Sequence, residues 1–252
     1  MNTKNNVNLS GVKNDSAESA GGYGFLSESF LDLYRELEEA LAVKYGSRSG
    51  LIQIFANGEG WRWREELNLF RETRNLLSHH ARLDGEPPVS PSPAAVNKLR
   101  EIVTYVQNPP RALSVCTRTS GLFVTDGGDS VTDLLAVMDK RGYSHIPVLK
   151  NGRLQGVFSV GTLFAYAKSY PDRGVKGLLV SDMSAFLPPE KHTTEQFCFA
   201  SAEDTSYDIR CKFSQGGPFC RRVAAVFVTE GGTEEGKLLG MITPWDIIRS
   251  GE

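Results

Sequence analysis

The stretch Gly240-Met241-Ile242-Thr243-Pro244-Trp245-Asp246-Ile247 combines the end of an apolar strand with the start of a helix. An earlier stretch, Gly156-Val157-Phe158-Ser159, has the same order of a glycine, two apolar residues and a hydroxyl residue. The two stretches lie 84 positions apart, and each closes a predicted strand and opens a predicted helix. An internal repeat of this size predicts two similar units about a pseudo-twofold axis, with both strand-to-helix junctions facing a shared cleft.

The residues around these stretches alternate short β-branched runs with short helices. In the first repeat we expect a helix with an apolar stripe between strands at 122–125, 145–149 and 154–159; the stripe is Val131, Leu134, Leu135 and Met138. In the second repeat we expect a strand near 197–201, a helix near 203–214, strands at 223–229 and 238–243, and a final helix. Gly152 and the segment 231–236 supply the hairpin turns. Each repeat is therefore predicted to follow the order β-α-β-β-α.

Both repeats resemble the cystathionine-β-synthase (CBS) domain family. Units of that family end in glycine, apolar residues, Ser or Thr, two further residues and Asp, as the second repeat does with Thr243 and Asp246. The first repeat shares the apolar helix, Ile146-Pro147-Val148, an Asn-Gly turn and Gly156-Val157. The resemblance implies a tandem CBS pair, with repeat 1 at 111–180 and repeat 2 at 181–252.

The Ser/Thr-x-x-Asp motif has a physical reason. A hydroxyl at the first turn of a helix lies beside free backbone N–H groups, which favour a phosphate. A carboxylate one turn later can accept hydrogen bonds from two ribose hydroxyls. The resemblance therefore implies that Thr243 contacts phosphate and Asp246 the ribose of an adenosine-containing nucleotide, which acts as a regulatory ligand with no cofactor required. The same spacing is typical of a capping box, so simple capping of the last helix stays open.

The first repeat departs from this motif. Ser159 is present, but Thr162 stands where the family has Asp. A neutral hydroxyl cannot chelate a ribose diol as a carboxylate does, so we expect one competent site, with the site of the first repeat altered or empty. His145 precedes Ile146-Pro147, where the family often has a residue that lines the cleft, and it completes the predicted nucleotide-binding set of Thr243, Asp246, Ser159 and His145.

The first part of the chain has helical periodicity. Residues 1–22 are rich in Asn, Ser and Gly and are predicted to be disordered, because they cannot bury enough apolar surface. Ser29 and Asp32 resemble a capping pair that begins a helix. Further helices are predicted at 51–55, 61–79 and 92–107, with a proline-rich loop at 83–93. Their apolar stripes are Phe30, Leu33, Leu37 and Leu41; Trp63, Leu67, Phe70 and Leu77; and Val96, Leu99, Ile102, Val103 and Val106.

Asn108-Pro109-Pro110 ends the last of these helices, since proline lacks the N–H that a helix interior needs. Residues 23–110 are therefore predicted to form a small helical bundle. The fold class predicted for the whole chain is α+β, with this N-terminal bundle followed by the two repeats around a pseudo-twofold cleft.

The end of the second long helix carries the stretch Arg74-Asn75-Leu76-Leu77-Ser78-His79, which resembles the signature of HEPN domains. These are small helical bundles, and their catalytic members are metal-independent ribonucleases that act as dimers. The resemblance implies that Arg74 stabilises phosphate charge, that His79 is the general acid or base, and that Asn75 orients one of them. The chemistry is reasonable, because histidine transfers protons near pH 7 and a guanidinium stabilises a developing phosphorane.

Two interpretations of this motif stay open. Arg74 and His79 would lie about 140° apart on a regular helix, so one chain would not bring them together, whereas a two-chain site could. Alternatively, Arg74 pairs with Glu38 or Glu39 inside the bundle, and His79 caps the helix C-terminus. Residues 23–110 contain ten Lys and Arg against twelve Asp and Glu, so no strong RNA-attracting field is evident.

Composition limits the class of protein. The net charge of −2 and the pI near 6.1 argue against a general polyanion binder and leave room for a small local basic site. The four cysteines lack metal-ligand spacing, which predicts no metal site and a reducing compartment. The sequence shows no signal peptide and no span of about 18 apolar residues, so we expect a cytoplasmic protein without membrane contact.

Two hypotheses of function follow. In the first, an adenine-nucleotide-sensing CBS pair controls a homodimeric N-terminal ribonuclease with a composite Arg/His site, and RNA is a partner. In the second, the protein is a non-catalytic ligand-binding module whose helical domain serves dimerisation or partner docking. The sequence does not name the nucleotide or the partner.

Overall fold

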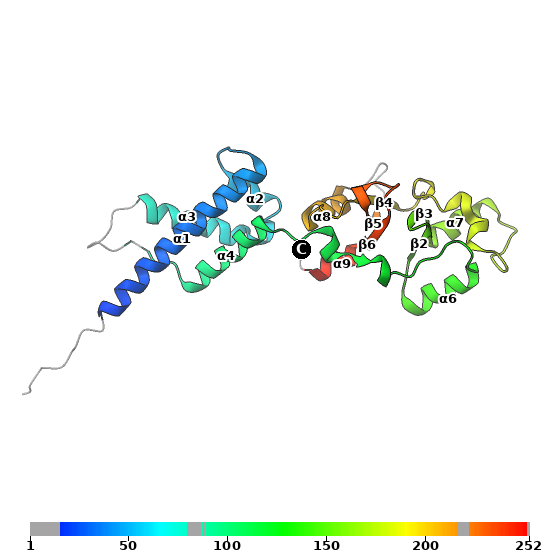
Figure 1. Cartoon of the computed structure of the whole chain (residues 1–252), viewed down its shortest axis with the longest axis horizontal. Coiled ribbons are helices and arrows are strands. Elements are labelled where there is room, and N and C mark those ends of the chain that lie inside the picture. The colour runs from blue at the N-terminus through cyan, green and yellow to red at the C-terminus, as the bar shows by residue number, and fades with distance from the viewer. Residues whose placement is uncertain (1–15, 80–86, 88, 216–221, 251–252) are drawn as a thin grey trace, which may run out of the picture. The chain divides into compact units, whose positions relative to one another are not determined.

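The computed structural model describes residues 16–79, 87, 89–215 and 222–250. The chain divides into two units, residues 1–108 and 109–252, here called the helical unit and the repeat unit (Figure 1). The division lies beside the Asn108-Pro109-Pro110 stretch. Among the described residues, no helix combines the length and the apolar character that a membrane span needs. The same residues contain no group of three or more His, Cys, Asp or Glu side chains that could hold a metal ion.

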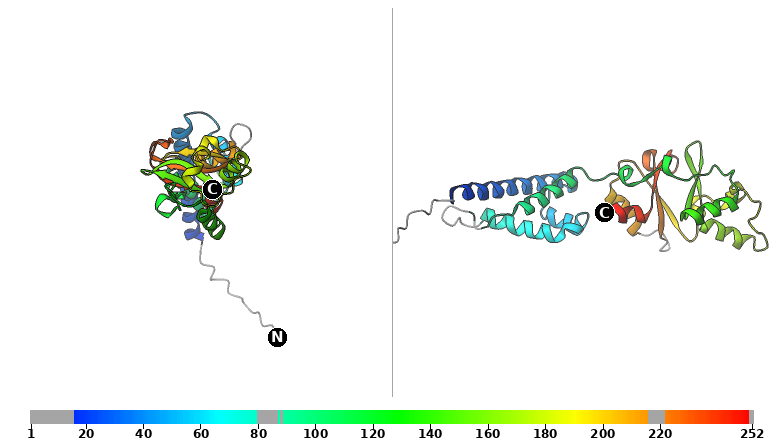
Figure 2. Two further views of the ribbon diagram at one scale, coloured as in Figure 1. Left: turned by 90° about the vertical axis from the view of Figure 1, so that its right-hand side faces the viewer. Right: turned by 90° about the horizontal axis from the view of Figure 1, so that it is seen from below.

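The helical unit consists of α1 (Ser16–Tyr45), α2 (Leu51–Asn57), the 3-10 helix η1 (Trp61–Trp63), α3 (Arg64–His79) and α4 (Pro93–Gln107). α1 packs along α4, as Figures 1 and 2 show, and α2 and α3 complete the bundle. Ser92 caps α4 by accepting a hydrogen bond of 3.2 Å from the N–H of Ala95. The predicted stripes form the core, in which Phe30, Leu37, Leu67 and Leu99 are fully buried.

The start of the bundle differs from the prediction. α1 begins at Ser16, so residues 16–22, which the sequence analysis placed in a disordered segment, are helical, while residues 1–15 lie outside the described residues. Ser29 and Asp32 therefore lie inside α1 instead of capping it, and Asp32 pairs with Arg35 at 3.1 Å. Ala17, Glu18 and Ala20 are good helix formers, and elongating a packed helix requires no new nucleation, which explains the longer helix.

The repeat unit has two sheets. Its first half contains α5 (Ala112–Val115), β1 (Thr117–Arg118), α6 (Val131–Arg141), β2 (His145–Lys150), β3 (Arg153–Ser159) and α7 (Val160–Ser169). Its second half contains β4 (Gln196–Ala200), α8 (Ser206–Gln215), β5 (Val223–Thr229), β6 (Leu238–Ile242) and α9 (Pro244–Ser250). The strands form one sheet in the order β1-β6-β5-β4 and a separate hairpin, β2-β3. The α+β prediction is confirmed, and repeat 2 has the predicted order β-α-β-β-α.

The predicted strand at 122–125 is wrong. Within this segment, only Thr125 forms a bridge, which is parallel and pairs it with Val148. The N–H of Thr125 donates to the carbonyl oxygen of Pro147 at 3.0 Å, and the carbonyl oxygen of Thr125 accepts from the N–H of Leu149 at 2.7 Å. Leu122 packs against the core cluster that the four-stranded sheet shares with β3, and Phe123 packs against the core cluster of the hairpin, α6 and α7. The segment therefore passes from one core cluster to the other. The four-stranded sheet is completed instead by β1, which precedes this segment and pairs with β6.

The glycine that begins each quoted stretch is required by a close approach of another segment. A Cβ atom on Gly156 would lie 2.6 Å from the backbone of Leu187. A Cβ atom on Gly240 would lie 2.5 Å from Sγ of Cys116 and 2.7 Å from the carbonyl oxygen of Thr117. Since neither neighbour leaves room for a methyl group, glycine occupies the equivalent position in both repeats.

We predict that Gly156→Ala lowers the free energy of unfolding by about 1–3 kcal/mol, because the new methyl group meets backbone atoms that cannot move aside easily. Denaturant unfolding of the two proteins would measure this change. Gly174→Ala is the matched control, since a Cβ atom there would meet nothing within 4 Å. An equal effect of the two substitutions would contradict the explanation.

Candidate functional site: a cavity between the two strand-to-helix junctions

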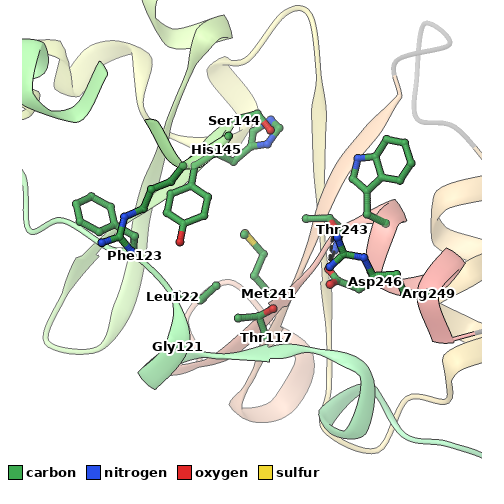
Figure 3. A pocket seen from close by; sticks show the side chains of 14 residues that line it. Thr117, Gly121, Leu122, Phe123, Ser144, His145, Met241, Thr243, Asp246 and Arg249 are labelled. Carbon is green, nitrogen blue, oxygen red and sulfur yellow. Dashed lines mark hydrogen bonds between the residues drawn. The ribbon is translucent and has the colours of Figure 1, made fainter. Parts of the chain in front are cut away.

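A cavity of about 490 Å³ lies in the repeat unit, beside the junction between β6 and α9 (Figure 3). Residues of the second repeat form one side of it, and residues of the first repeat form the other. In Figure 3, Thr243, Asp246 and Arg249 lie across the cavity from Ser144 and His145. The lining consists of Thr117, Gly121, Leu122, Phe123, Arg141, Gly142, Tyr143, Ser144, His145, Met241, Thr243, Trp245, Asp246 and Arg249.

Thr243 and Asp246 form a hydrogen-bonded pair at the edge of this cavity. The N–H and the hydroxyl of Thr243 each donate to Oδ2 of Asp246, at 2.7 Å. Both side chains are half-buried and both line the cavity. The carboxylate therefore caps α9 and faces the cavity at the same time. Because both hydrogen bonds end on Oδ2, neither of them uses Oδ1.

Several residues that line the cavity were not predicted from the sequence. Arg141 ends α6, and Gly142 follows it in the left-handed conformation, with φ of 68°, which turns the chain so that Tyr143 also reaches the cavity. Arg249 comes from α9, one residue before the described part of the chain ends at Ser250. Gly142 follows the predicted apolar helix, and a glycine in this position is a sequence signal for a helix C-cap. The sequence did not indicate which cavity the turn would border.

Ser159 does not line this cavity. Ser159 is 1% exposed. Its hydroxyl caps α7 by accepting a hydrogen bond of 3.3 Å from the N–H of Thr162. In return, the hydroxyl of Thr162 accepts a hydrogen bond of 3.1 Å from the N–H of Ser159. The hydroxyl of Ser159 also donates to the carboxylate of Glu195. The first junction is thus altered, as expected, but it is filled by a side chain that the sequence analysis did not consider.

His145 connects the cavity with Glu195. His145 is among the residues that line the cavity, and its Nε2 lies 2.7 Å from Oε2 of Glu195. The ring packs edge-on against Phe197, at 5.6 Å between centroids. A second histidine, His192, places Nδ1 2.9 Å from Oε1 of the same carboxylate. Glu195 therefore fixes His145 in the cavity wall from behind.

Two regions of the chain, residues 115–169 and 193–251, match the family model described as CBS domain. This part of the chain is a CBS domain pair. The first matched region contains the junction at Ser159 and the second contains the junction at Thr243, which confirms the predicted tandem arrangement. The helical unit lies outside both regions, so its resemblance to HEPN domains stays a prediction.

Similar solved structures are CBS domains with low sequence identity. The CBS domain pair of protein MJ0100, in complex with 5′-methylthioadenosine and S-adenosyl-L-methionine, is 14% identical with a TM-score of 0.38, over 57% of this chain and 96% of that chain. The CBS domain of the bacterial CNNM/CorC family Mg2+ transporter, in complex with ATP, is 19% identical with a TM-score of 0.39, over 56% and 85%. CBSX2 in complex with AMP is 19% identical with a TM-score of 0.40, over 56% and 96%. The comparison with curated proteins found no match.

The carboxyl group of Glu195 is strongly perturbed by its neighbours. Burial alone would raise its pKa, but the hydrogen bonds from His145, His192 and Ser159 outweigh burial and hold the pKa of Glu195 well below its ordinary value of 4.5. The group is therefore ionised throughout the physiological range, and its negative charge is a permanent part of the structure.

The predicted catalytic residues lie near the end of α3 in the helical unit. Arg74 is half-buried, with its guanidinium 5.9 Å from the centroid of the Tyr34 ring, and its Nη1 donates to Oδ1 of Asn75 at 3.3 Å. Burial and the nearby Glu38 raise the pKa of Tyr34 to about 12, so this phenol stays neutral. His79 is exposed at the last residue of the helix.

Within the described residues, no ion pair joins Arg74 to Glu38 or Glu39, so the predicted pairing inside the bundle is replaced by the contact with the aromatic ring of Tyr34. A cavity of about 360 Å³ in this unit does not include Arg74, Asn75 or His79; it is lined by Arg35, Glu38, Glu39, Ala42, Ser47, Arg48 and Leu51. Trp63, by contrast, is buried in the core as predicted, at 5% exposure.

We predict that the contribution of Glu195 to the free energy of unfolding is lost at acid pH. A carboxyl whose pKa is lower in the folded state stabilises the fold above its unfolded pKa, and this contribution is lost as the pH falls below about 4.5. At pH 7 the melting temperature of Glu195→Gln should lie several degrees below that of the wild type, and the difference should shrink toward pH 3. Thermal denaturation between pH 7 and pH 3 measures this.

The exposed Glu190, on the same connecting segment, provides the control. Glu190→Gln should keep the pH dependence of the wild type. A constant difference between Glu195→Gln and the wild type at all pH values would show that the Glu195 charge does not stabilise the fold.

Proposed function

We propose that the CBS pair binds an adenine nucleotide in the 490 Å³ cavity and thereby regulates the output of the helical unit. The observation that carries this proposal is the half-buried Thr243–Asp246 pair, which turns both a hydroxyl and a carboxylate toward a cavity that arginines also line. The cavity volume lies within the usual range for small-molecule sites, about 300–1,000 Å³.

Each part of a nucleotide has a chemical counterpart in the lining. Asp246 can accept hydrogen bonds from the ribose hydroxyls, with Oδ1 unused by the Thr243 pair. Arg141 and Arg249 offer cationic donors to phosphate, together with the hydroxyl of Thr243. An adenine ring needs apolar and aromatic contacts, which the lining supplies through Leu122, Phe123, Tyr143, Met241 and Trp245.

We expect Asp246→Ala to weaken AMP binding at least about tenfold, because hydrogen bonds to a charged acceptor contribute about 1.5–3 kcal/mol each. The measurement is isothermal titration of AMP and ATP into the purified chain. The same substitution also removes a helix cap, which costs about 0.5–2 kcal/mol of stability, so a control for capping is required.

Asp208 provides that control. It accepts from the N–H and the hydroxyl of Thr205, at 2.9 and 2.7 Å, in the same geometry at α8, but it does not line the cavity. Asp208→Ala should lose comparable stability and keep nucleotide affinity. If AMP and ATP fail to bind, or if both variants lose affinity equally, Thr243 and Asp246 only cap α9.

Regulation requires that the nucleotide favours one of two arrangements of the protein, since a ligand shifts an equilibrium only through differential affinity. We infer that these are arrangements of a homodimer. Phe164 of α7 and Ile248 of α9 are 57% and 65% exposed, and each stands five residues after its junction hydroxyl, Ser159 or Thr243. A contiguous exposed apolar patch marks an association surface, and we infer that these two side chains belong to one. Sedimentation with and without AMP measures this equilibrium, and a monomer at every concentration contradicts it.

The simplest output of the helical unit is dimerisation or partner docking. A metal-independent ribonuclease is the second candidate. It is favoured by the hydrogen bond from Arg74 to Asn75, which matches the orienting role that the HEPN resemblance implies for Asn75. Asn75 and His79 are exposed, so both can reach a partner chain or RNA. We infer a cytoplasmic location for either output, because adenine nucleotides and RNA are abundant there.

For the ribonuclease candidate, wild-type protein should cleave a mixed RNA pool in the presence of a chelator, and His79→Ala should reduce the rate by about 10²-fold or more, as expected for loss of a general acid or base. Arg71→Ala is the control, since Arg71 is exposed on the same helix and donates to Gln53 at 3.1 Å. If the protein binds AMP but cleaves no RNA with or without ligand, the ribonuclease candidate is contradicted, and dimerisation or partner docking is the output that agrees with the result.

A further inference from the structure

The side chains that line the 490 Å³ cavity carry more positive than negative charge. Among the described residues of the lining, Arg141 and Arg249 are the guanidinium groups and Asp246 is the carboxylate. The chain as a whole, in contrast, has a net charge of −2. Oδ2 of Asp246 accepts two hydrogen bonds from Thr243, so part of its negative charge is already balanced inside the protein. The cavity therefore favours a ligand with several negative charges.

Neither arginine is neutralised by a neighbouring acid. Within the part of the chain that the structure describes, no carboxylate forms an ion pair with Arg141 or Arg249. Both arginines are exposed, so their side chains can turn toward a ligand without breaking an ion pair. A guanidinium binds a phosphate through two parallel N–H donors. Two such groups in one cavity can therefore bind two phosphates.

The two arginines belong to opposite sides of the cavity. Arg249 lies beside Thr243 and Asp246 in Figure 3, on the side that the second repeat forms. Arg141 ends α6 and stands three residues before Ser144, which Figure 3 shows on the other side. When Asp246 holds the ribose, the phosphate bonded to that ribose lies on the side of Thr243 and Arg249. Arg141 then meets only a phosphate farther from the ribose.

We propose that Arg141 contacts the terminal phosphate of a nucleotide and thereby makes the cavity select ADP and ATP over AMP and adenosine. This inference deepens the proposed function and rests on it, because it takes the nucleotide to bind at Thr243 and Asp246. Arg249 and the hydroxyl of Thr243 contact the phosphate next to the ribose, which all three nucleotides share. AMP leaves Arg141 without a phosphate, whereas the additional phosphates of ADP and ATP supply its acceptor.

The experiment is isothermal titration of adenosine, AMP, ADP and ATP into the purified chain, at constant ionic strength and without divalent cations. ATP and ADP should bind at least about tenfold more tightly than AMP, because each adds a charge-assisted contact with Arg141. Equal affinities for AMP and ATP overturn the selectivity and leave the proposed function standing. Absence of binding by all four ligands contradicts the proposed function, and the inference with it.

Arg141→Gln tests the residue itself. It should weaken ATP binding by at least about tenfold and AMP binding by less, so that the ratio of the two affinities falls toward one. Arg141→Lys should keep an intermediate ratio, because an ammonium supplies the charge without the paired donors. Lys140→Gln is the matched control: it removes the same charge from the preceding, exposed residue of α6, which does not line the cavity. An equal loss of the ratio in Lys140→Gln overturns the role of Arg141, since net charge would then be responsible.

Arg249→Gln separates the two arginines. Because Arg249 contacts the phosphate that AMP and ATP share, this variant should weaken both nucleotides by similar factors and keep the wild-type ratio. The opposite pattern, in which Arg249→Gln removes the preference for ATP and Arg141→Gln retains it, overturns the assignment of the terminal phosphate to Arg141.

Discussion

The pairing of β1 with β6 is the constraint on which the 490 Å³ cavity depends. This pairing sets Thr117 opposite Met241, and both residues line the cavity. It is possible because Gly240 has no side chain where Cys116 and Thr117 cross the strand. The strand that leads into the first repeat thereby becomes the edge of the sheet of the second repeat, so one wall of the cavity is built by residues more than a hundred positions apart in the chain.

The local chemistry of a Thr-x-x-Asp turn does not by itself make a binding site. Thr205 and Asp208 at α8 have the same hydrogen bonds as Thr243 and Asp246 at α9. Of the two pairs, the one at Thr243 and Asp246 lines the 490 Å³ cavity, where arginines and aromatic side chains from both repeats gather. A carboxylate that caps a helix can therefore also face a cavity. Whether it does so depends on which other segments of the chain pack around the helix start.

The two repeats differ at equivalent junctions, where Thr162 stands in place of Asp246 and Glu195 contacts Ser159. At Thr243 the junction opens on a cavity, whereas at Ser159 the carboxylate of Glu195 occupies the helix start. Because Glu195 immediately precedes β4 and its partner His145 begins β2, the same hydrogen bonds also join the two repeats. The carboxylate of Glu195 thus distinguishes the two junctions and also connects the two repeats.

The sequence by itself determined the bundle, the internal repeat and the two junctions, since apolar periodicity and short motifs report contacts made within an element or its near neighbours. It also identified Thr243, Asp246 and His145, all of which line the cavity. Only the tertiary structure decided that residues 122–125 cross between two cores, that Arg141 joins Arg249 in the lining, and that Glu195 fills the first junction. Glu195 and Ser159 are 36 residues apart, and no local pattern encodes a hydrogen bond between side chains that chain folding alone brings together.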